Sequence, residues 1–174
     1  SMRGAITILI LAWIISTVVS EMHTGEYLST LVAGNIHAGF LPVILFMLAG
    51  VMAFATGTSW GTFGIMLPIA AAMAVKVEPS LIIPCMSAVM AGAVFGDHCS
   101  PISDTTILSS TGAHCNHIDH VTSQFPYALT VAASAASGYL ALGMTGSAPL
   151  GFVVTGIVMV ILIFILKDKK KATA

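Results

Sequence analysis

Two aspartates, Asp97 and Asp104, lie in a polar interruption of an otherwise apolar part of the sequence, together with the hydroxyls of Ser100, Ser103 and Thr105. Hard cations prefer oxygen ligands of this kind. Burial in apolar surroundings disfavours the charged form of a carboxylate, so such a group could hold a proton and exchange it for a cation. These residue types predict a site at which Na+, as a transported metal ion, competes with H+ for Asp97 and Asp104.

A second polar interruption, at residues 56–62, supplies more hydroxyls, and we expect Thr58 and Ser59 to contribute oxygens to the same site. Serine and threonine can instead serve only to let helices pack closely. That alternative is reasonable for single hydroxyls but weak for the aspartates, because an intramembrane carboxylate costs about 2.5–3.5 kcal/mol even on lenient insertion scales. The aspartates therefore carry the functional hypothesis.

The composition indicates that these residues lie in a membrane protein. Charged residues make up 7% of the 174 residues, against about 25% in ordinary globular proteins, and 57% of the residues are hydrophobic. This leaves too few charges to coat a soluble surface, and a net charge of −1 provides no basic patch for nucleic acid. We predict an all-α, polytopic membrane protein whose residues 1–174 form a single transmembrane domain in contact with the lipid bilayer.

The apolar segments are of two kinds. Three can cross a bilayer as simple helices, because each approaches the roughly 20 apolar residues that a span requires: residues 4–20, 125–144 and 149–166. Residues 40–75 are too long for one crossing and slightly short for two, which favours a re-entrant hairpin with its tip at 56–62. Residues 80–110 predict a span that breaks at 96–104, because Pro101 removes a backbone donor. A weaker break is expected at 21–26.

Lysines fix the expected orientation. Four of them follow the last apolar segment, at 167–171, and short cytoplasmic segments are enriched in Lys and Arg. We therefore expect a cell inner-membrane location with residues 167–174 as a cytoplasmic basic tail. The hairpin at 40–75 then enters from outside, and the histidine-rich segment 112–124 lies inside as a loop.

The histidines of that segment, His114, His117 and His120, occur with Cys115 and Asp119. They could be a metal site, but their spacings of three residues drift around a helix, so a solvated polar connector is the favoured interpretation. Titration of these histidines near neutral pH could also report internal pH. We expect no cofactor and no enzyme chemistry.

The longer motifs resemble the NhaC-type Na+/H+ antiporter family, and the similarity runs over most of the chain. The motifs that carry it are GTSWGTFG at 57–64, GDHCSPISDTT at 96–106, SSTG at 109–112, HIDHV at 117–121, LAW at 11–13 and GEYL at 25–28. The resemblance implies an inverted-repeat transporter in which each repeat contributes a re-entrant hairpin and a discontinuous helix. It also implies complete members more than twice this length, with the present chain as the C-terminal half. The expected partner is a missing N-terminal half or a second copy in a homodimer.

Several alternatives stay open. Relatives of this family are thought to include Na+- or H+-coupled exchangers of organic acids or amino acids. The chain could also be an inactive fragment that needs its N-terminal half, and a passive channel is harder to exclude. An intramembrane aspartyl protease is disfavoured, because residues 94–97 lack the Gly-x-Gly-Asp pattern and both aspartates share one break. We predict a secondary transporter that exchanges Na+ for H+.

Overall fold

The computed structural model describes residues 14, 17–18, 21–22, 27 and 37–172, with side chains up to residue 167. In this part of the chain all regular structure is helical. The elements are the 3-10 turns η1 (Ala38–Phe40) and η2 (Pro79–Leu81) and the helices α3 (Leu41–Thr56), α4 (Ser59–Val77), α5 (Ile82–Cys99), α6 (Asp104–Gly112), α7 (His117–Thr145) and α8 (Ala148–Ala172). Five stretches are long and apolar enough to cross a membrane: Ala38–Thr56, Ser59–Val77, Pro79–Cys99, His117–Thr145 and Ala148–Lys167. The expected segment at 4–20 and the expected break at 21–26 lie largely outside the described residues.

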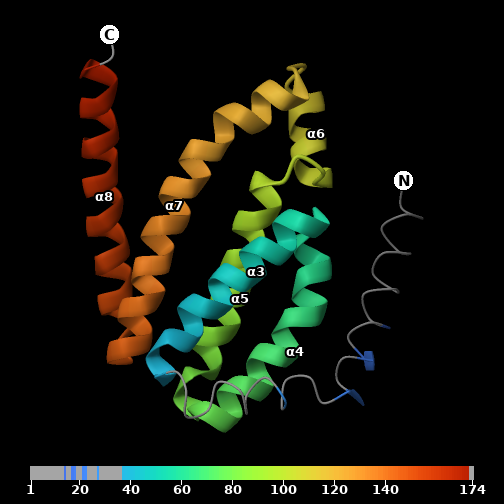
Figure 1. Ribbon diagram of the computed structural model, residues 1–174, viewed down its shortest axis with the longest axis vertical. Helices are drawn as coiled ribbons and strands as arrows, with labels where there is room; N and C mark the ends of the chain where they lie inside the picture. Colours follow the sequence, from blue (N-terminus) through green and yellow to red (C-terminus); the bar gives the residue numbers. More distant parts are fainter. Residues whose placement is uncertain (1–13, 15–16, 19–20, 23–26, 28–36, 173–174) are drawn as a thin grey trace.

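Helices α3 and α5 form the centre of the bundle and run in the same direction (Figure 1). A Cβ atom at Gly92 would collide with the backbone carbonyl of Phe46, and one at Gly96 with the carbonyl of Gly50. Two glycines four residues apart on one helix let a neighbouring backbone approach closely, as in other membrane helix pairs. The position of the α5 C-terminus relative to α3 is therefore fixed by direct backbone contact.

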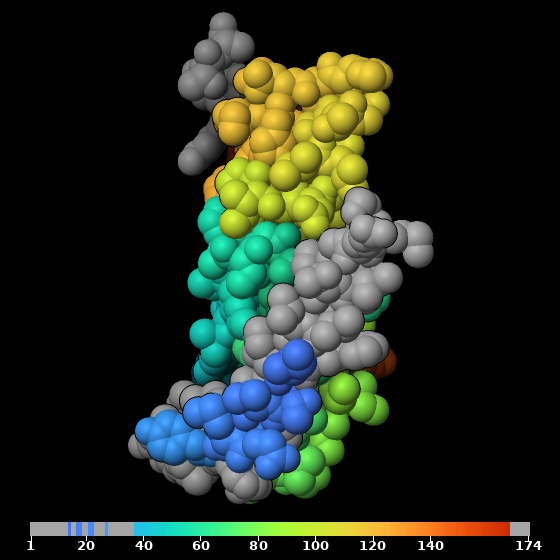
Figure 2. Space-filling model, turned by 90° about the vertical axis from the view of Figure 1, so that its right-hand side faces the viewer, coloured from blue at the N-terminus to red at the C-terminus, as the bar shows by residue number. Residues whose placement is uncertain are grey.

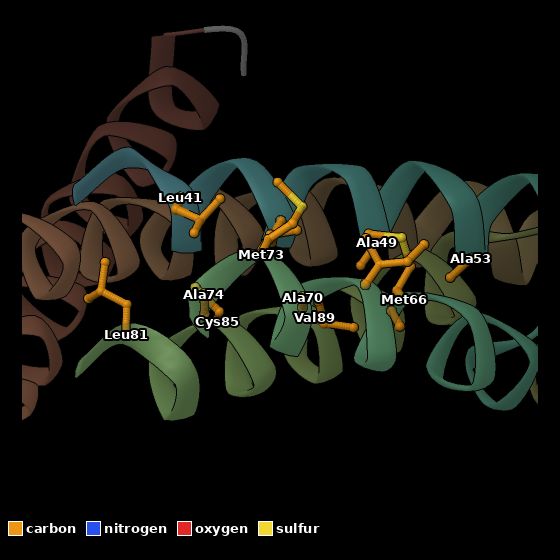
Figure 3. Close-up of a cluster of buried hydrophobic side chains, with 13 residues drawn as sticks. Leu41, Ala49, Ala53, Met66, Ala70, Met73, Ala74, Leu81, Cys85 and Val89 are labelled. Carbon is orange, nitrogen blue, oxygen red and sulfur yellow. The ribbon is translucent and has the colours of Figure 1, made fainter. Parts of the chain in front are cut away.

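Helix α4 returns antiparallel to α3 and completes a core of small and flexible side chains (Figure 3). Ala49, Ala70 and Ala74 are fully buried there beside Met66 and Met73. Alanine allows the three helices to approach, and the flexible methionines fill the gaps that remain.

Helices α7 and α8 form a second hairpin beside this centre (Figure 1). Tyr139 of α7 donates a hydrogen bond from its hydroxyl to the Ser87 carbonyl of α5 (3.0 Å), and its ring lies 5.6 Å from that of Phe46. At the end of the bundle where α3 begins, Gly143 lies against the backbone of Gly39. The turn that follows α5, helix α6 and the start of α7 form one continuous surface beyond the α3–α4 turn (Figure 2).

The α3–α4 turn is tighter than predicted. Gly57 closes α3 in the left-handed conformation (φ 68°), and its N–H donates to the Ala53 carbonyl (2.8 Å). Thr58 caps α4 by accepting the N–H of Gly61 at 3.3 Å. These two caps confine the break to residues 57–58, so the expected polar loop at 56–62 was too long: Thr62 is already inside α4.

The break in the second segment falls where proline was expected to place it. Helix α5 ends at Cys99, Ser100 adopts an extended conformation before Pro101, and α6 starts after Ser103. The expected break at 96–104 was too long at both ends, because Gly96 stays helical where it packs on α3.

The histidine-rich segment differs more from the prediction. Its second half is not a loop but the first two turns of α7, since the helix begins at His117 rather than near residue 125. Asn116 starts it by accepting the N–H groups of Ile118 (2.9 Å) and Asp119 (3.3 Å).

The glycine contacts predict a specific loss of stability. Gly96→Ala should destabilise the protein by about 1–3 kcal/mol, because the added methyl group forces α5 away from α3. The melting temperature in detergent, followed by fluorescence-detected size exclusion, measures this. Gly156→Ala on α8 is the matched control, since nothing lies near its Cβ position. Equal melting temperatures for the two variants would contradict the close packing.

Candidate functional site

Asp97 lies in the last turn of α5 and is buried, with 4% of its surface exposed. Its carboxylate accepts hydrogen bonds from three hydroxyls. Ser103 donates to Oδ1 at 2.6 Å, while Ser59 and Thr105 donate to Oδ2 at 3.2 and 3.3 Å. The hydroxyl oxygens of Ser103 and Thr105 also lie 2.8 Å apart, and because each hydroxyl has one proton, Thr105 donates either to Asp97 or to Ser103. A buried carboxylate requires such partners, because without them its desolvation would cost several kcal/mol.

The three hydroxyls come from the starts of two helices. Ser59 is the first residue of α4, Ser103 is the N-cap of α6, and Thr105 is the second residue of α6. Both helices begin where the chain is forced to turn, at Gly57–Thr58 and at residues 100–103. A Cβ atom at Gly57 would meet the carbonyl of Ile102, so the two turns lie against each other. Residues far apart in sequence thereby converge on one carboxylate.

Three helix ends set the electrostatics of this cluster. The N-termini of α4 and α6 carry partial positive charge, and the C-terminal turn of α5, to which Asp97 belongs, carries partial negative charge. A hydroxyl has one proton and two lone pairs, so it can donate to the carboxylate or turn its oxygen toward a cation. The arrangement gathers oxygen atoms that can accept hydrogen bonds or bind a hard cation.

Among the residues predicted for the site, the structure brings together Asp97, Ser59, Ser103 and Thr105. Ser100 is buried beside them, but its hydroxyl accepts the N–H of Ile102 (3.4 Å). The Thr58 hydroxyl is occupied in capping α4.

Asp104 is separated from the cluster. It is the first residue of α6 and is exposed, and in the described part of the chain no hydrogen bond joins its carboxylate to Asp97 or to the hydroxyls. Seven residues would be two turns on one face of a continuous helix. The break at 100–103 reorients α6, so the two carboxylates point to different environments.

Sequence reasoning missed a second layer of hydrogen bonds behind the cluster. The His98 carbonyl accepts hydrogen bonds from Gln124 (3.1 Å) and Thr106 (3.5 Å), and the His117 imidazole contacts Ser110 and Pro101. The signal available in the sequence was Asn116, a strong N-cap residue that would have made His117 helical. Within the residues described, no group of three or more His, Cys, Asp or Glu side chains is placed to hold a metal ion. His114, His117 and His120 therefore do not converge.

Five candidate spans, with an interrupted helix and a carboxylate buried at the interruption, are typical of a multi-pass membrane protein. The family model described as "Na+/H+ antiporter family" matches residues 1–144. The chain therefore belongs to the Na+/H+ antiporter family.

Individual relatives extend this finding. An uncharacterised protein of Haemophilus influenzae is 63% identical over 97% of this chain and 33% of its own length. A malate-2H+/Na+-lactate antiporter of Bacillus subtilis is 35% identical over 49% of the chain and 18% of its own length. An arginine/ornithine antiporter of Halobacterium salinarum is 34% identical over 66% of the chain and 27% of its own length. The chain thus spans about a third or less of these relatives. No solved structure matches it.

The geometry assigns Thr58 a capping role that can be tested. Thr58→Ala should lower the stability of the protein by about 0.5–2 kcal/mol, because α4 loses its N-cap, whereas Thr58→Ser should restore it. Thermal unfolding of the purified protein at saturating and at zero Na+ measures both effects. Should Thr58→Ala leave stability unchanged and alter only the Na+ response, Thr58 would be a ligand rather than a cap.

Proposed function

We propose that this chain forms part of a secondary transporter that exchanges Na+ for H+ across the membrane, with Asp97 as the shared binding group. The observation that carries the proposal is the buried Asp97 carboxylate with three hydroxyls at an interrupted helix. Family membership supports it independently.

Competition between the two cations follows from the chemistry of the site. With Asp97 ionised, its oxygens and those of Ser59, Ser103 and Thr105 offer a Na+ ion the hard ligands that it prefers. With Asp97 protonated, one oxygen becomes a donor, the negative charge is lost and the cation is expelled. Each ion therefore displaces the other, which is the minimum requirement of an exchanger.

The remaining predicted residues take supporting roles in this proposal. Ser100 lies buried in the turn between α5 and α6 and adds its oxygen to the ion-binding set when Na+ is bound, and Thr58 contributes by holding the start of α4. Asp104, exposed at the start of α6, attracts cations toward the site through its charge.

The depth of the site supports the re-entrant hairpin. Helix α3 begins at the same end of the bundle as α8, since Gly39 contacts Gly143 near the α7–α8 turn. The 20 residues Ala148–Lys167 rise about 30 Å, while the 16 residues of α3 rise about 24 Å and run obliquely to α8 (Figure 1). Although Ala38–Thr56 is by itself long enough to cross a membrane, we propose on this basis that the α3–α4 turn stops short of the basic end of α8, inside the layer that α8 spans. Backbone exposed at that depth has to line a cavity or be covered by protein.

This chain matches only part of the length of its relatives, and the remaining part could cover the α3–α4 turn. We assign the chain to the NhaC-type members of the family, as the C-terminal half of an inverted-repeat transporter, with an N-terminal half or a second copy as partner. Its match to only 33% of the Haemophilus relative supports a partner segment of this kind. Transport is accordingly best tested in a chimera, in which this chain replaces its matching segment in that relative, as well as in the chain alone.

An exchanger of organic acids or amino acids coupled to Na+ or H+ is the second candidate. The organic-acid and amino-acid substrates of the Bacillus and Halobacterium antiporters favour it. Two helix N-termini meet near Asp97, and such ends can bind the carboxylate of a substrate when a basic side chain is absent. Uptake of labelled malate, lactate or arginine into vesicles distinguishes this candidate from simple cation exchange.

The central prediction concerns Asp97. Asp97→Asn in the chimera should abolish Na+-driven proton movement across everted membrane vesicles, because the neutral amide binds neither cation strongly. Its abundance in the membrane should stay near that of the parent, since removing a buried charge removes a desolvation cost. The parent's apparent Na+ affinity should rise with pH as the competing proton is withdrawn.

Asp104→Asn is the matched control for the same charge change. Because Asp104 is exposed and outside the hydroxyl cluster, this variant should keep exchange and weaken the apparent Na+ affinity only a few-fold. Parental exchange in Asp97→Asn, or a complete loss in Asp104→Asn alone, would move the site away from Asp97.

The orientation gives a separate prediction. We propose an inner-membrane location with the C-terminus in the cytoplasm, because the lysines at 167–171 follow the last span. In a Cys115→Ser background, where the remaining cysteines are buried, a cysteine introduced by Ala172→Cys should resist an impermeant thiol reagent in intact cells. Thr145→Cys, at the exposed α7–α8 turn, should react. The reverse pattern would invert the proposed topology.

A further inference from the structure

The His117 imidazole connects three parts of the chain that lie behind the Asp97 cluster. Its Nε2 lies 2.6 Å from the Pro101 carbonyl, and its Nδ1 lies 3.0 Å from the Ser110 hydroxyl. Pro101 belongs to the turn between α5 and α6, Ser110 lies near the end of α6, and His117 is the first residue of α7. One half-buried side chain thus joins the turn and α6 to α7.

The identity of each donor can be worked out from its partner. A carbonyl only accepts hydrogen bonds, so Nε2 must carry a proton toward Pro101. At Nδ1, the neutral imidazole accepts from the Ser110 hydroxyl. The charged imidazolium instead donates to that oxygen, while Ser110 keeps its bond to the Ile107 carbonyl (2.9 Å). The contact to Pro101 therefore persists in both protonation states.

The turn at 100–103, which His117 contacts through the Pro101 carbonyl, is also the turn that places Ser103 against Asp97. Pro101 lies two residues before Ser103, whose N–H donates to the Ser100 carbonyl at 3.3 Å within the same turn. The Ser103 hydroxyl makes the shortest contact of the cluster, 2.6 Å to Asp97, and it also caps α6. Proline cannot donate a backbone hydrogen bond of its own, so its carbonyl is the group through which a neighbour can hold this residue.

We infer that His117 is a positioning residue for the cation site: it fixes the turn at 100–103 so that Ser103 faces Asp97. This inference rests on the proposed function of Asp97 and adds a residue from a different helix. Neither of the two hydrogen bonds of the His117 imidazole goes to Asp97 or to the three hydroxyls around it. Its effect is therefore on how well the oxygens are prearranged for Na+, rather than on the exchange step itself.

The test compares three variants in the chimera. His117→Ala removes both hydrogen bonds, and the Na+ concentration for half-maximal exchange should rise at least five-fold while the maximal rate stays within about two-fold of the parent. His117→Gln should largely restore the affinity, because its amide nitrogen can donate to Pro101 and its oxygen can accept from Ser110. His120→Ala, three residues on, is the matched control and should resemble the parent. An unchanged Na+ affinity in His117→Ala, or no rescue by His117→Gln, would overturn the inference.

A second measurement does not depend on transport. Backbone amides at 102–106 should exchange with deuterium faster in His117→Ala than in the parent or in His117→Gln, while amides of α3 stay protected. Faster exchange throughout the protein would mean general unfolding and would contradict a local positioning role. Exchange changes confined to 102–106, together with an inactive Asp97→Asn variant, support both proposals. Deuterium exchange could become faster at 102–106 while Asp97→Asn transports normally. The proposed function would then fail, but the positioning of this turn by His117 would still be supported.

Discussion

A carboxylate buried in an apolar bundle must be given polar partners, and this requirement organises the part of the fold around Asp97. The partners cannot come from a continuous helix alone, because the backbone donors of its interior are already used. The chain meets the requirement by starting two helices at Asp97, which brings hydroxyl side chains and positive helix ends to the same point. The short turn at Gly57–Thr58 and the proline break at 100–103 are the structural means of placing those starts.

The same arrangement would allow the proposed transport site to stay stable whether Na+ or a proton is bound. Hydroxyls are both donors and acceptors, so Ser59, Ser103 and Thr105 can satisfy the ionised carboxylate, its protonated form or a cation by rotation alone. In the proposed exchange no side chain has to lose its partners when one ion replaces the other. The second layer, formed by His117 and Gln124, leaves the oxygens free for this task because it holds backbone carbonyls instead.

Much of this could be predicted from the residues. The low charge predicted helices in a membrane, Pro101 predicted the break, and the oxygen-rich motifs predicted that Ser59 and Ser103 would accompany Asp97. The sequence could not separate Asp97 from Asp104, because the direction of each side chain depends on how far α6 turns after the break. Nor could it assign Thr58, since a hydroxyl before a helix is equally suited to capping or to binding. The His117–Pro101 contact joins residues 16 positions apart through tertiary packing, which no local pattern encodes.

The contacts of Gly92 and Gly96 with α3 also have a mechanical consequence. This close contact leaves little room between the two backbones, so we expect α3 and α5 to move together and to carry Asp97 with them. In the proposed exchange, opening and closing of the site would then come from the elements that bear the hydroxyls. A small rotation at the start of α4 or α6 would move the hydroxyl oxygens away from the bound ion while the carboxylate stayed in place. In this proposed mechanism the charged carboxylate would stay in place, and the neutral hydroxyl ligands would move to bind or release the ion.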